Sequence, residues 1–379
     1  MNDEKLGAFP LQIEPMRVRR TYRGGGELDR RHGVADPREG ACPEEWLASM
    51  TRAINPGFPP VENEGLSVAV LPGGRALLRD LVEQAPEAML GRVHVEEYGT
   101  QPGVLAKIID SDERLSIQVH PDKAFARAYF RSDYGKTECW HILETRTVNG
   151  QPPFLMMGFR PGITREMWED VYRRQDIPAM LGCLHRVTPQ QGETWLIRGG
   201  MPHAIGPGCT LVEIQEPTDY TLRSERMQAD GTPIPDVLIH QGLGEKALMA
   251  CFHYDGLTLG ELRESCRLAP RTAQLAGSSR WQLLVGPEDT PCFAMERLEI
   301  ASSVRFSGVG RFSILTVLEG AGTLSWAWGA MPLKQGAQIF LPAGVEHFTL
   351  DAPAQTPLIA VRCHPPGVSP QAPGTAGAE

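Results

Sequence analysis

Short runs of β-branched and aromatic residues, separated by glycine and proline, recur along the chain. Residues 115–121, 312–317 and 337–341 are runs of this kind, and apolar and polar residues alternate in the first. Short strands bounded by such turn residues are typical of β-sandwiches and barrels. The 40 glycines and 32 prolines would also interrupt long helices. We therefore predict a mainly β fold.

Three stretches have helical spacing instead. One covers residues 75–83, the second follows Pro121, and the third begins after Thr164, a plausible N-cap, and stops at Pro178. The apolar positions that recur on one face are Leu77, Leu78, Leu81 and Val82 in the first, Phe125, Ala128 and Tyr129 in the second, and Met167, Trp168, Val171 and Tyr172 in the third. Helices are expected to decorate the sheets at intervals.

Residues 192–203 and 336–347 repeat one pattern. Each has a turn glycine, a run of hydrophobic residues, a second glycine turn and a histidine at equal spacing. Both match the second motif of the cupin barrel, G-x5-P-x-G-x2-H, with Arg198 in place of proline in the first copy. Duplication is the best explanation. We predict two cupin (jelly-roll) barrels with a few added helices.

The pattern also predicts domain boundaries. From about residue 256 onward it is purely strand-like, and the end of the chain is rich in Pro, Gly and Ala. We predict a metal-binding catalytic domain over residues 1–255, which includes N-terminal strands and helical insertions. A metal-free cupin domain should follow over residues 256–367, because no matching histidine pair precedes His347. A flexible tail should cover residues 368–379.

Composition excludes several classes of function. A net charge of -9 argues against general attraction to nucleic acid or an anionic membrane. No apolar run reaches about 18 residues, the length of a spanning helix, and the N-terminus lacks a secretion signal. Eight scattered cysteines without a C-x-x-C pair favour a reducing cytoplasm. The chain could be a monomer or a homodimer.

Candidate metal ligands lie in the first repeat and before it. Gln118 and His120 are two residues apart, so in a strand both side chains point to the same face. With Glu138 and His203 they make a zinc-type donor set that leaves a position open for water or substrate. The alternative is that the histidines are hydrogen-bonded core residues, which requires several motifs to coincide by chance. His141 would face away from Glu138 on a strand, so we interpret it as a packing or hydrogen-bonding residue.

Several phrases resemble one family. Residues 115–122, 135–140, 202–206 and 213–223 are similar to type I mannose-6-phosphate isomerases. The likeness extends from residue 10 to about residue 225 and more loosely over the C-terminal cupin.

The resemblance implies a site. Its members bind one zinc per chain at the positions of Gln118, His120, Glu138 and His203. It further implies catalytic roles for Arg223, Lys136 and Asp219, and a place on the phosphate side of the substrate for Lys107 and Ser116.

The implied reaction interconverts mannose 6-phosphate and fructose 6-phosphate by moving a proton between C2 and C1 through an enediol(ate). Zinc as a Lewis acid and Arg223 as a fixed cation suit the developing charge. The proton-transfer base, Lys136 or an acidic residue near the metal, stays open. So does the exact sugar phosphate, because residues 224–226 differ from the usual continuation.

Two other functions are compatible with a metal-binding cupin. A regulatory metal cupin that binds a sugar phosphate without catalysis needs less than the full residue set, and a metal-dependent cupin oxygenase gains no support from residues 219–223.

Overall fold

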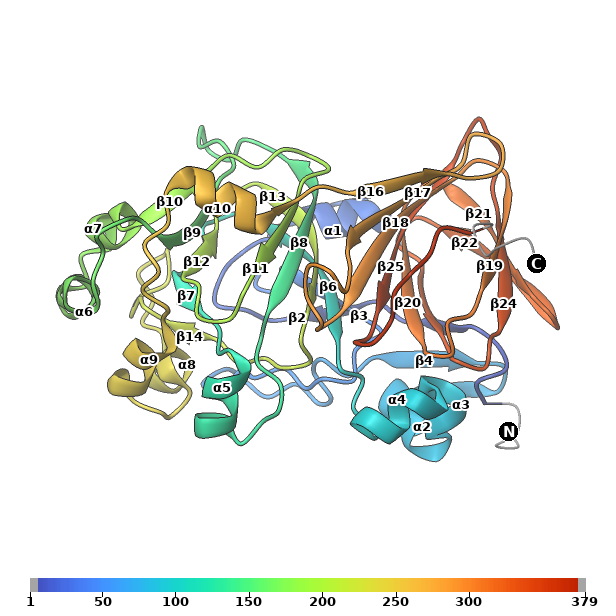
Figure 1. The fold of residues 1–379 in the computed structure, drawn as a ribbon, viewed down its shortest axis with the longest axis horizontal. Coiled ribbons are helices and arrows are strands. Elements are labelled where there is room, and N and C mark those ends of the chain that lie inside the picture. The colour runs from blue at the N-terminus through green and yellow to red at the C-terminus, as the bar shows by residue number, and fades with distance from the viewer. Residues whose placement is uncertain (1–5, 374–379) are drawn as a thin grey trace.

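The computed structural model describes residues 6–373. Two strand-rich bodies lie side by side, one green and one orange to red, with helices at their edges (Figure 1). Strands pair antiparallel within the sheets. The prediction of a mainly β fold is confirmed.

The first barrel consists of two sheets. The five-stranded sheet has the order β10 (Leu184–Val187), β9 (Leu155–Phe159), β12 (His203–Ile205), β7 (Gln118–Val119) and β14 (Leu222–Arg223). The seven-stranded sheet has the order β15 (Arg267–Leu268), β11 (Thr194–Ile197), β8 (Glu138–Thr145), β13 (Cys209–Gln215), β6 (Leu105–Ser111), β3 (Glu44–Leu47) and β2 (Met16–Val18). Trp140 and Met157, one from each sheet, belong to the core between them.

The second barrel is built in the same way. Its nine-stranded sheet has the order β16 (Arg271–Gln274), β17 (Arg280–Val285), β18 (Ala294–Ile300), β25 (Leu358–His364), β20 (Ser313–Glu319), β23 (Gln338–Leu341), β1 (Leu11–Ile13), β4 (Val68–Leu71) and β5 (Gly74–Leu77). The four-stranded sheet has the order β19 (Ser303–Ser307), β24 (His347–Asp351), β21 (Ala321–Trp326) and β22 (Gly329–Lys334). Leu298 and Leu350 pack between these two sheets.

A third core joins the barrels. Val212 and Ile214 of β13 belong to one apolar cluster with Met295 of β18 and Phe340 of β23. All seven residues of β13 are buried, because one face lies in the first barrel and the other against the second. A charged residue in this strand must therefore find a partner inside the protein.

Strands from each side of the predicted boundary at residue 256 join the barrel that lies mainly on the other side. Strands β1, β4 and β5 extend the large sheet of the second barrel, whereas β15 pairs with β11 of the first. The division into residues 1–255 and 256–367 stays a prediction about which parts fold as units.

The predicted helices form with adjusted limits. Helix α2 (Leu78–Gln84) starts later than expected, because residues 74–77 pair with β4 as β5. After Pro121 come α5 (Lys123–Phe125) and a π-helical turn, Ala126–Phe130. Thr164 caps α6 (Arg165–Arg174) through the backbone N–H of Met167, whose own side chain is exposed. The helices that were not predicted are α1 (Gly26–Arg31), α3 (Pro86–Leu90), α4 (Arg92–Tyr98), α7 (Ile177–Gly182), α8 (Asp236–His240), α9 (Glu245–Cys251) and α10 (Leu259–Cys266).

Helix α10 corrects the prediction that the chain is purely strand-like after residue 256. Thr258 and Glu261 form a capping box at its start, and Leu262 and Cys266, four residues apart, are buried. The T-x-x-E signal was present in the sequence.

The two repeat segments fold alike, as a turn, a strand, a second turn and the start of another strand. Gly192 and Gly336 both have positive φ at the first turn, at 84° and 82°. The histidines differ, since His203 is fully buried and His347 is exposed. The histidine of the second copy therefore points away from the core of its barrel.

Residues 368–373 of the predicted flexible tail lie within the described range, and some of them are buried, whereas the flexibility of the tail stays a prediction. Val368 and Ala372 are buried, and Ala372 packs with the core of the second barrel. Small apolar side chains suffice to close the end of this barrel. Residues 374–379 lie outside the described range. None of the helices between residues 6 and 373 has both the length and the apolar composition needed to cross a membrane.

Candidate metal centre

Strand register assembles the candidate site. Gln118 of β7 lies directly opposite His203 of β12 on one side and Arg223 of β14 on the other. His120 follows β7, and Glu138 begins β8 in the facing sheet. Segments distant in sequence thus meet at one end of the first barrel.

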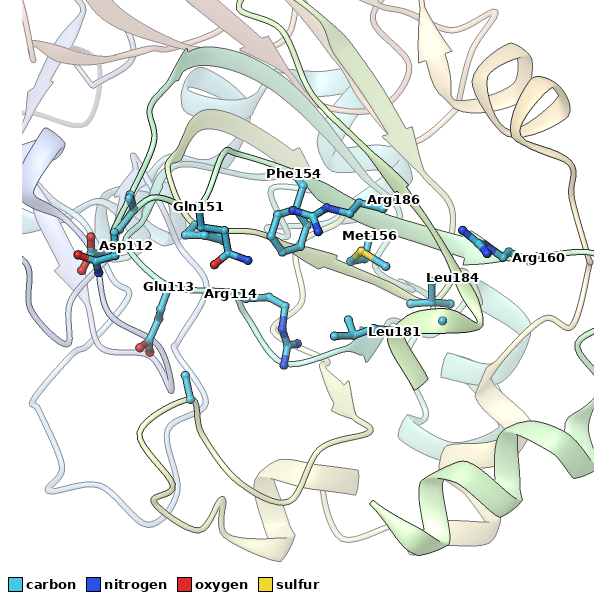
Figure 2. A pocket seen from close by; sticks show the side chains of 15 residues that line it. Asp112, Glu113, Arg114, Gln151, Phe154, Met156, Arg160, Leu181, Leu184 and Arg186 are labelled. Carbon is cyan, nitrogen blue, oxygen red and sulfur yellow. The ribbon is translucent and has the colours of Figure 1, made fainter. Parts of the chain in front are cut away.

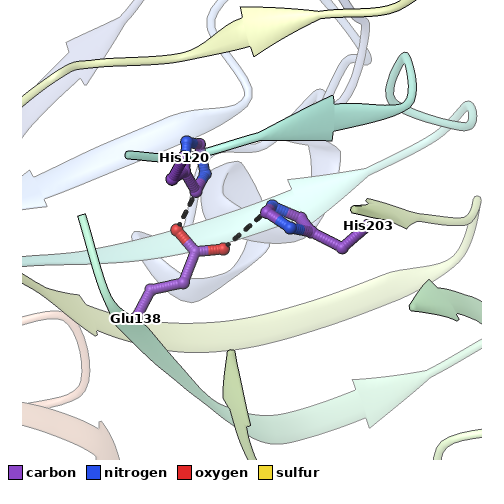
Figure 3. A group of neighbouring side chains, drawn as sticks. All are labelled: His120, Glu138 and His203. Carbon is purple, nitrogen blue, oxygen red and sulfur yellow. Dashed lines mark ion pairs between the residues drawn. The ribbon is translucent and has the colours of Figure 1, made fainter. Parts of the chain in front are cut away.

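His120, Glu138 and His203 form one buried cluster, with ligand atoms all within 4.8 Å of one another. The carboxylate of Glu138 lies between the two rings (Figure 3). Its Oε2 is 3.1 Å from Nε2 of His120, and its Oε1 is 3.3 Å from Nε2 of His203. The side-chain nitrogen of Gln118 is 3.3 Å from Nε2 of His203. The four predicted metal ligands therefore lie together.

Backbone carbonyls orient both rings. Nδ1 of His120 lies 2.9 Å from the carbonyl oxygen of Tyr220, and Nδ1 of His203 lies 2.9 Å from that of Met201. Because a carbonyl oxygen only accepts, each Nδ1 carries the proton and each Nε2 turns its lone pair toward Glu138. This tautomer is the one that binds a metal through Nε2.

Electrostatics keep the donors in their metal-binding forms. Burial, reinforced by Lys136, lowers the pKa of His120 to about 3, and burial also lowers the pKa of His203. Burial alone would raise the pKa of Glu138, but Lys136 and His120 outweigh it and hold that pKa well below its usual range. Near neutral pH the cluster offers two neutral imidazoles and one carboxylate.

The donor set fits a zinc-type ion. Oε1 of Glu138 is buried and accepts no hydrogen bond from the residues described. A buried carboxylate oxygen in that state is costly unless a cation compensates it. Two histidines and one carboxylate, with Gln118 beside them, suit a divalent ion that keeps a position open for a further ligand.

Lys136 contacts the same donor atoms. Its Nζ is 2.7 Å from Nε2 of His120 and 2.8 Å from Oε2 of Glu138. Since a metal ion needs these lone pairs, the ammonium group must withdraw when the metal binds. After withdrawal Lys136 would still lie beside the bound ion, where a group that transfers a proton must lie to reach the substrate.

Arg223 is a buried cation without a carboxylate partner. Its Nη1 donates to the carbonyl oxygen of Leu238 at 2.6 Å, and no acidic group within residues 6–373 forms an ion pair with it. Burial lowers its pKa to about 10, although Asp219 acts in the opposite direction. A guanidinium buried in this way calls for an anion from outside the chain.

Asp219 lies in the same site but is held by other groups. Its carboxylate accepts two hydrogen bonds of 3.2 Å from Arg20 and one of 2.7 Å from the backbone N–H of Ile54. These bonds suit a residue that orients Arg20 and the loop around it.

Lys107 is similarly engaged, with Nζ 3.3 Å from Glu44 and 3.0 Å from Glu213. These carboxylates outweigh the effect of burial and raise the pKa of Lys107. Contact between Lys107 and a substrate phosphate would require it to leave at least one of these partners.

One narrow cavity of about 30 Å³ connects these residues. Its lining includes every predicted residue outside the His–Glu–His cluster, namely Lys107, Ser116, Gln118, Lys136, Asp219 and Arg223. The space corresponds to about one water molecule, so a sugar phosphate requires bordering side chains to move.

Sequence reasoning missed part of the lining, namely Arg20, Tyr22, Glu44 and Glu213. Tyr22 donates to Glu44 at 2.9 Å, and Glu44 is 2.9 Å from Nε of Arg20. A signal was available for Glu213, because a lone carboxylate between Val212 and Ile214 interrupts an apolar strand. For Arg20, nothing local distinguishes it from the arginines around it.

A wider hollow of about 550 Å³ lies apart from this cavity (Figure 2). Phe154, Met156 and Leu184 contribute apolar side chains to it. Arg114 reaches the same region but is paired with Glu225 at 2.6 Å. None of the predicted site residues lines this hollow.

His141 faces away from Glu138, as predicted. It is 3% exposed, its Nδ1 is 3.0 Å from Oγ1 of Thr194, and burial together with Arg297 lowers its pKa to about 4. Between pH 6.5, the ordinary pKa of histidine, and about pH 4, His141 is protonated in the unfolded chain but stays neutral in the folded protein. This histidine therefore makes stability fall as the pH drops through that window.

We predict that His141→Leu flattens the pH dependence of stability. Wild type should lose on the order of 3 kcal/mol between about pH 7 and pH 4 through this group, and the variant should not. Urea unfolding across this range measures the difference, with exposed His347→Leu as the control. Equal slopes for wild type and His141→Leu would contradict the assignment.

Comparison with known proteins identifies relatives. Residues 66–138 match the model of the phosphomannose isomerase type I catalytic domain, and residues 287–362 that of the mannose-6-phosphate isomerase cupin domain. The chain is 24% identical to a mannose-6-phosphate isomerase of Streptococcus mutans, over 75% of this chain and 84% of the relative. It is 25% identical to the probable mannose-6-phosphate isomerase GmuF of Bacillus subtilis, over 90% and 96%.

Solved structures share the fold. The crystal structure of mannose 6-phosphate isomerase from Bacillus subtilis matches with a TM-score of 0.72 at 22% identity, over 94% of this chain and 99% of that one. A zinc-bound mannose 6-phosphate isomerase matches with a TM-score of 0.70 at 18% identity, over 94% and 99%.

Two barrels, one of which contains a buried His–Glu–His cluster that could hold a metal ion, define a protein of the cupin class. The relatives narrow this class further. The chain resembles type I mannose-6-phosphate isomerases in both barrels, at 24% and 25% identity to the two relatives named above.

Proposed function

We propose that this protein is a zinc-dependent aldose–ketose isomerase that interconverts mannose 6-phosphate and fructose 6-phosphate. The observation that carries the proposal is the buried, unpaired guanidinium of Arg223, which borders one cavity with Gln118 and Lys136. The His–Glu–His cluster alone would be compatible with many activities of cupin proteins. An anion site beside it selects a phosphorylated substrate.

The charges around the cavity support this assignment. Arg20, Lys107 and Lys136 each contact a carboxylate of the protein, whereas Arg223 contacts only carbonyl oxygens. A phosphate group, or an enediolate oxygen of the substrate, would supply the missing partner of Arg223.

The residues divide the chemistry between them. Zinc held by His120, Glu138 and His203 would supply Lewis acidity toward the sugar oxygens. Lys136 lies against this cluster and is placed to take or return the proton that moves between C2 and C1. Arg20, fixed by Asp219 and Glu44, keeps the cavity wall in position.

The segment after Arg223 has little direct access to the substrate. Glu225 turns away, accepting a hydrogen bond from the backbone N–H of Ile117 at 2.7 Å and pairing with Arg114. Residues 224–226 do not border the cavity. Their departure from the family pattern thus bears less on the choice of sugar than their position in the sequence suggested.

The direct test measures conversion of mannose 6-phosphate to fructose 6-phosphate by metal-loaded protein, before and after chelation and after zinc is restored. We expect activity that chelation removes and zinc returns. Metal-loaded protein that binds mannose 6-phosphate without turnover would overturn the enzyme in favour of a regulatory binding protein. Turnover of another hexose phosphate alone would overturn the stated substrate.

We also predict that Lys136→Met keeps or gains zinc affinity while losing most activity. The substitution removes the cation that competes for His120 and Glu138, and it removes a proton-transfer group worth about 10²–10⁴-fold in rate. Zinc titration and kcat measure the two effects separately, with Lys246→Met as the surface control. A variant with wild-type kcat would exclude Lys136 from proton transfer.

A further inference from the structure

The interior of the second barrel contains an unexpected polar group. Trp281 of β17, Glu296 of β18, and Arg362 and His364 of β25 lie on the strand faces that point into this barrel. The strand register gives these orientations. Leu298, two residues after Glu296 on β18, belongs to the barrel core, and Arg362 lies directly opposite Glu296 on β25. All of these polar residues are buried.

Within this group both carboxylate oxygens of Glu296 have partners. Its Oε1 is 3.0 Å from Nε2 of His364 and 3.3 Å from Nε of Arg362, and its Oε2 accepts a hydrogen bond from Nε1 of Trp281. The attraction of Arg362 and these hydrogen bonds outweigh burial and lower the pKa of Glu296. The carboxylate has no need of a further cation.

Arg362 is not satisfied in the same way. It is only 4% exposed, and its guanidinium lies 5.8 Å from the ring centre of Phe306 and 5.3 Å from that of Phe348. Its Nε makes no hydrogen bond, and its two terminal nitrogens donate to no residue that the structure describes. Nε is the one nitrogen of this guanidinium that is fully buried without a hydrogen bond, so the terminal nitrogens are the donors that a ligand in an adjoining space can use.

A cavity of about 210 Å³ lies against these donors. Arg362 and Glu296 border it on the barrel side, residues 305–309 form a second wall, and residues 369–373 a third. It is far larger than the space of one water molecule, yet smaller than the usual site of a drug-sized ligand. Its size suits a small organic molecule.

We propose that the second barrel binds a small organic carboxylate, held by the terminal nitrogens of Arg362. The parallel N–H groups of a guanidinium match the two oxygens of a carboxylate. Glu296 already balances the charge of Arg362, and Arg305 is the remaining charged residue that borders the cavity, so a single negative charge fits better than a phosphate dianion. Phe306, Val309 and Pro370 offer apolar contacts to a short hydrocarbon body.

This site is independent of the metal centre, since the two lie in different barrels. The second barrel would thus bind a ligand of its own. The ligand would lie in the barrel interior, as the His–Glu–His cluster does in the first barrel.

Isothermal titration calorimetry of the full-length, metal-loaded protein with butyrate and benzoate tests the proposal, with inorganic phosphate and mannose as comparison ligands. We expect carboxylate binding that weakens at least tenfold in Arg362→Gln and remains unchanged in Arg280→Gln, which alters a partly exposed arginine of the same sheet. Absence of carboxylate binding to wild type, or tighter binding of phosphate, would overturn the proposal.

Arg362→Gln leaves Glu296 buried without its cation, so the variant could fail to fold. Val309→Trp avoids this problem, because Val309 is 39% exposed at the edge of the cavity and a larger side chain there obstructs the cavity without touching Arg362. We expect Val309→Trp to weaken butyrate and benzoate binding while the isomerase assay stays at the wild-type rate. Unchanged carboxylate affinity in this variant would place the ligand elsewhere.

Discussion

Replacing Arg223 by glutamine is expected to lower kcat/KM for mannose 6-phosphate by about 10²–10³-fold, the usual cost of losing one preorganised group that stabilises charge. Arg223 is the buried cation of the cavity that has no carboxylate partner, so its charge is available to the substrate. Steady-state kinetics measure the loss, and zinc content should stay at the wild-type level because Arg223 holds no metal ligand.

Two further variants sharpen this test. Arg223→Lys keeps the charge but loses the planar fork of donors, so an intermediate rate would show that geometry contributes beyond charge. Arg226→Gln, three residues along the chain, is the matched control, since Arg226 is partly exposed and paired with Glu245. If Arg223→Gln and Arg226→Gln had the same kcat/KM, Arg223 would have no role in the reaction.

Replacing Glu138 by glutamine is expected to abolish zinc binding and lower activity by at least about 10²-fold, because even groups that only support a metal ligand cost about 10–100-fold when removed. Glu138 supplies the anionic oxygen between the two histidines. The neutral amide retains the shape of the side chain but not its charge, so the divalent ion loses its main electrostatic partner.

Metal analysis and thermal unfolding with and without chelator measure this effect. Wild type should be destabilised by chelation, and Glu138→Gln should be insensitive to it. Glu144→Gln, on the same strand and less buried, is the control. Stoichiometric zinc in Glu138→Gln would disprove the proposed centre.

The candidate metal ligands can be recognised in the sequence because their signals are local. Gln118 and His120 are two residues apart in a strand, so the backbone itself puts them on one face. His203 follows a repeated turn motif whose first glycine adopts positive φ in both copies, a geometry that residue type alone predicts. The N-cap of α6 at Thr164 could also be predicted from a local signal, because it involves only Thr164 and the backbone N–H of Met167.

The remainder of the cavity depends on strand pairing. Glu44, Lys107 and Glu213 meet because β3, β6 and β13 are neighbours in one sheet, although 169 residues separate the two glutamates. The family resemblance implies a phosphate-side role for Lys107, and only the contacts in the structure show that two carboxylates already engage it. The distant pairing of Arg20 with Asp219 has no local signal at all.

By itself, the sequence determined the β architecture, the duplicated unit and the His–Glu–His donor set, since each rests on residue type and short spacing. Only the tertiary structure decided which charges are compensated. Within residues 6–373 it leaves Arg223 without a carboxylate partner, and it pairs Arg362 with Glu296 while no described residue accepts from the terminal nitrogens of Arg362. The physical reason is that the cost of a buried charge depends on partners brought from distant strands, and no local pattern specifies them.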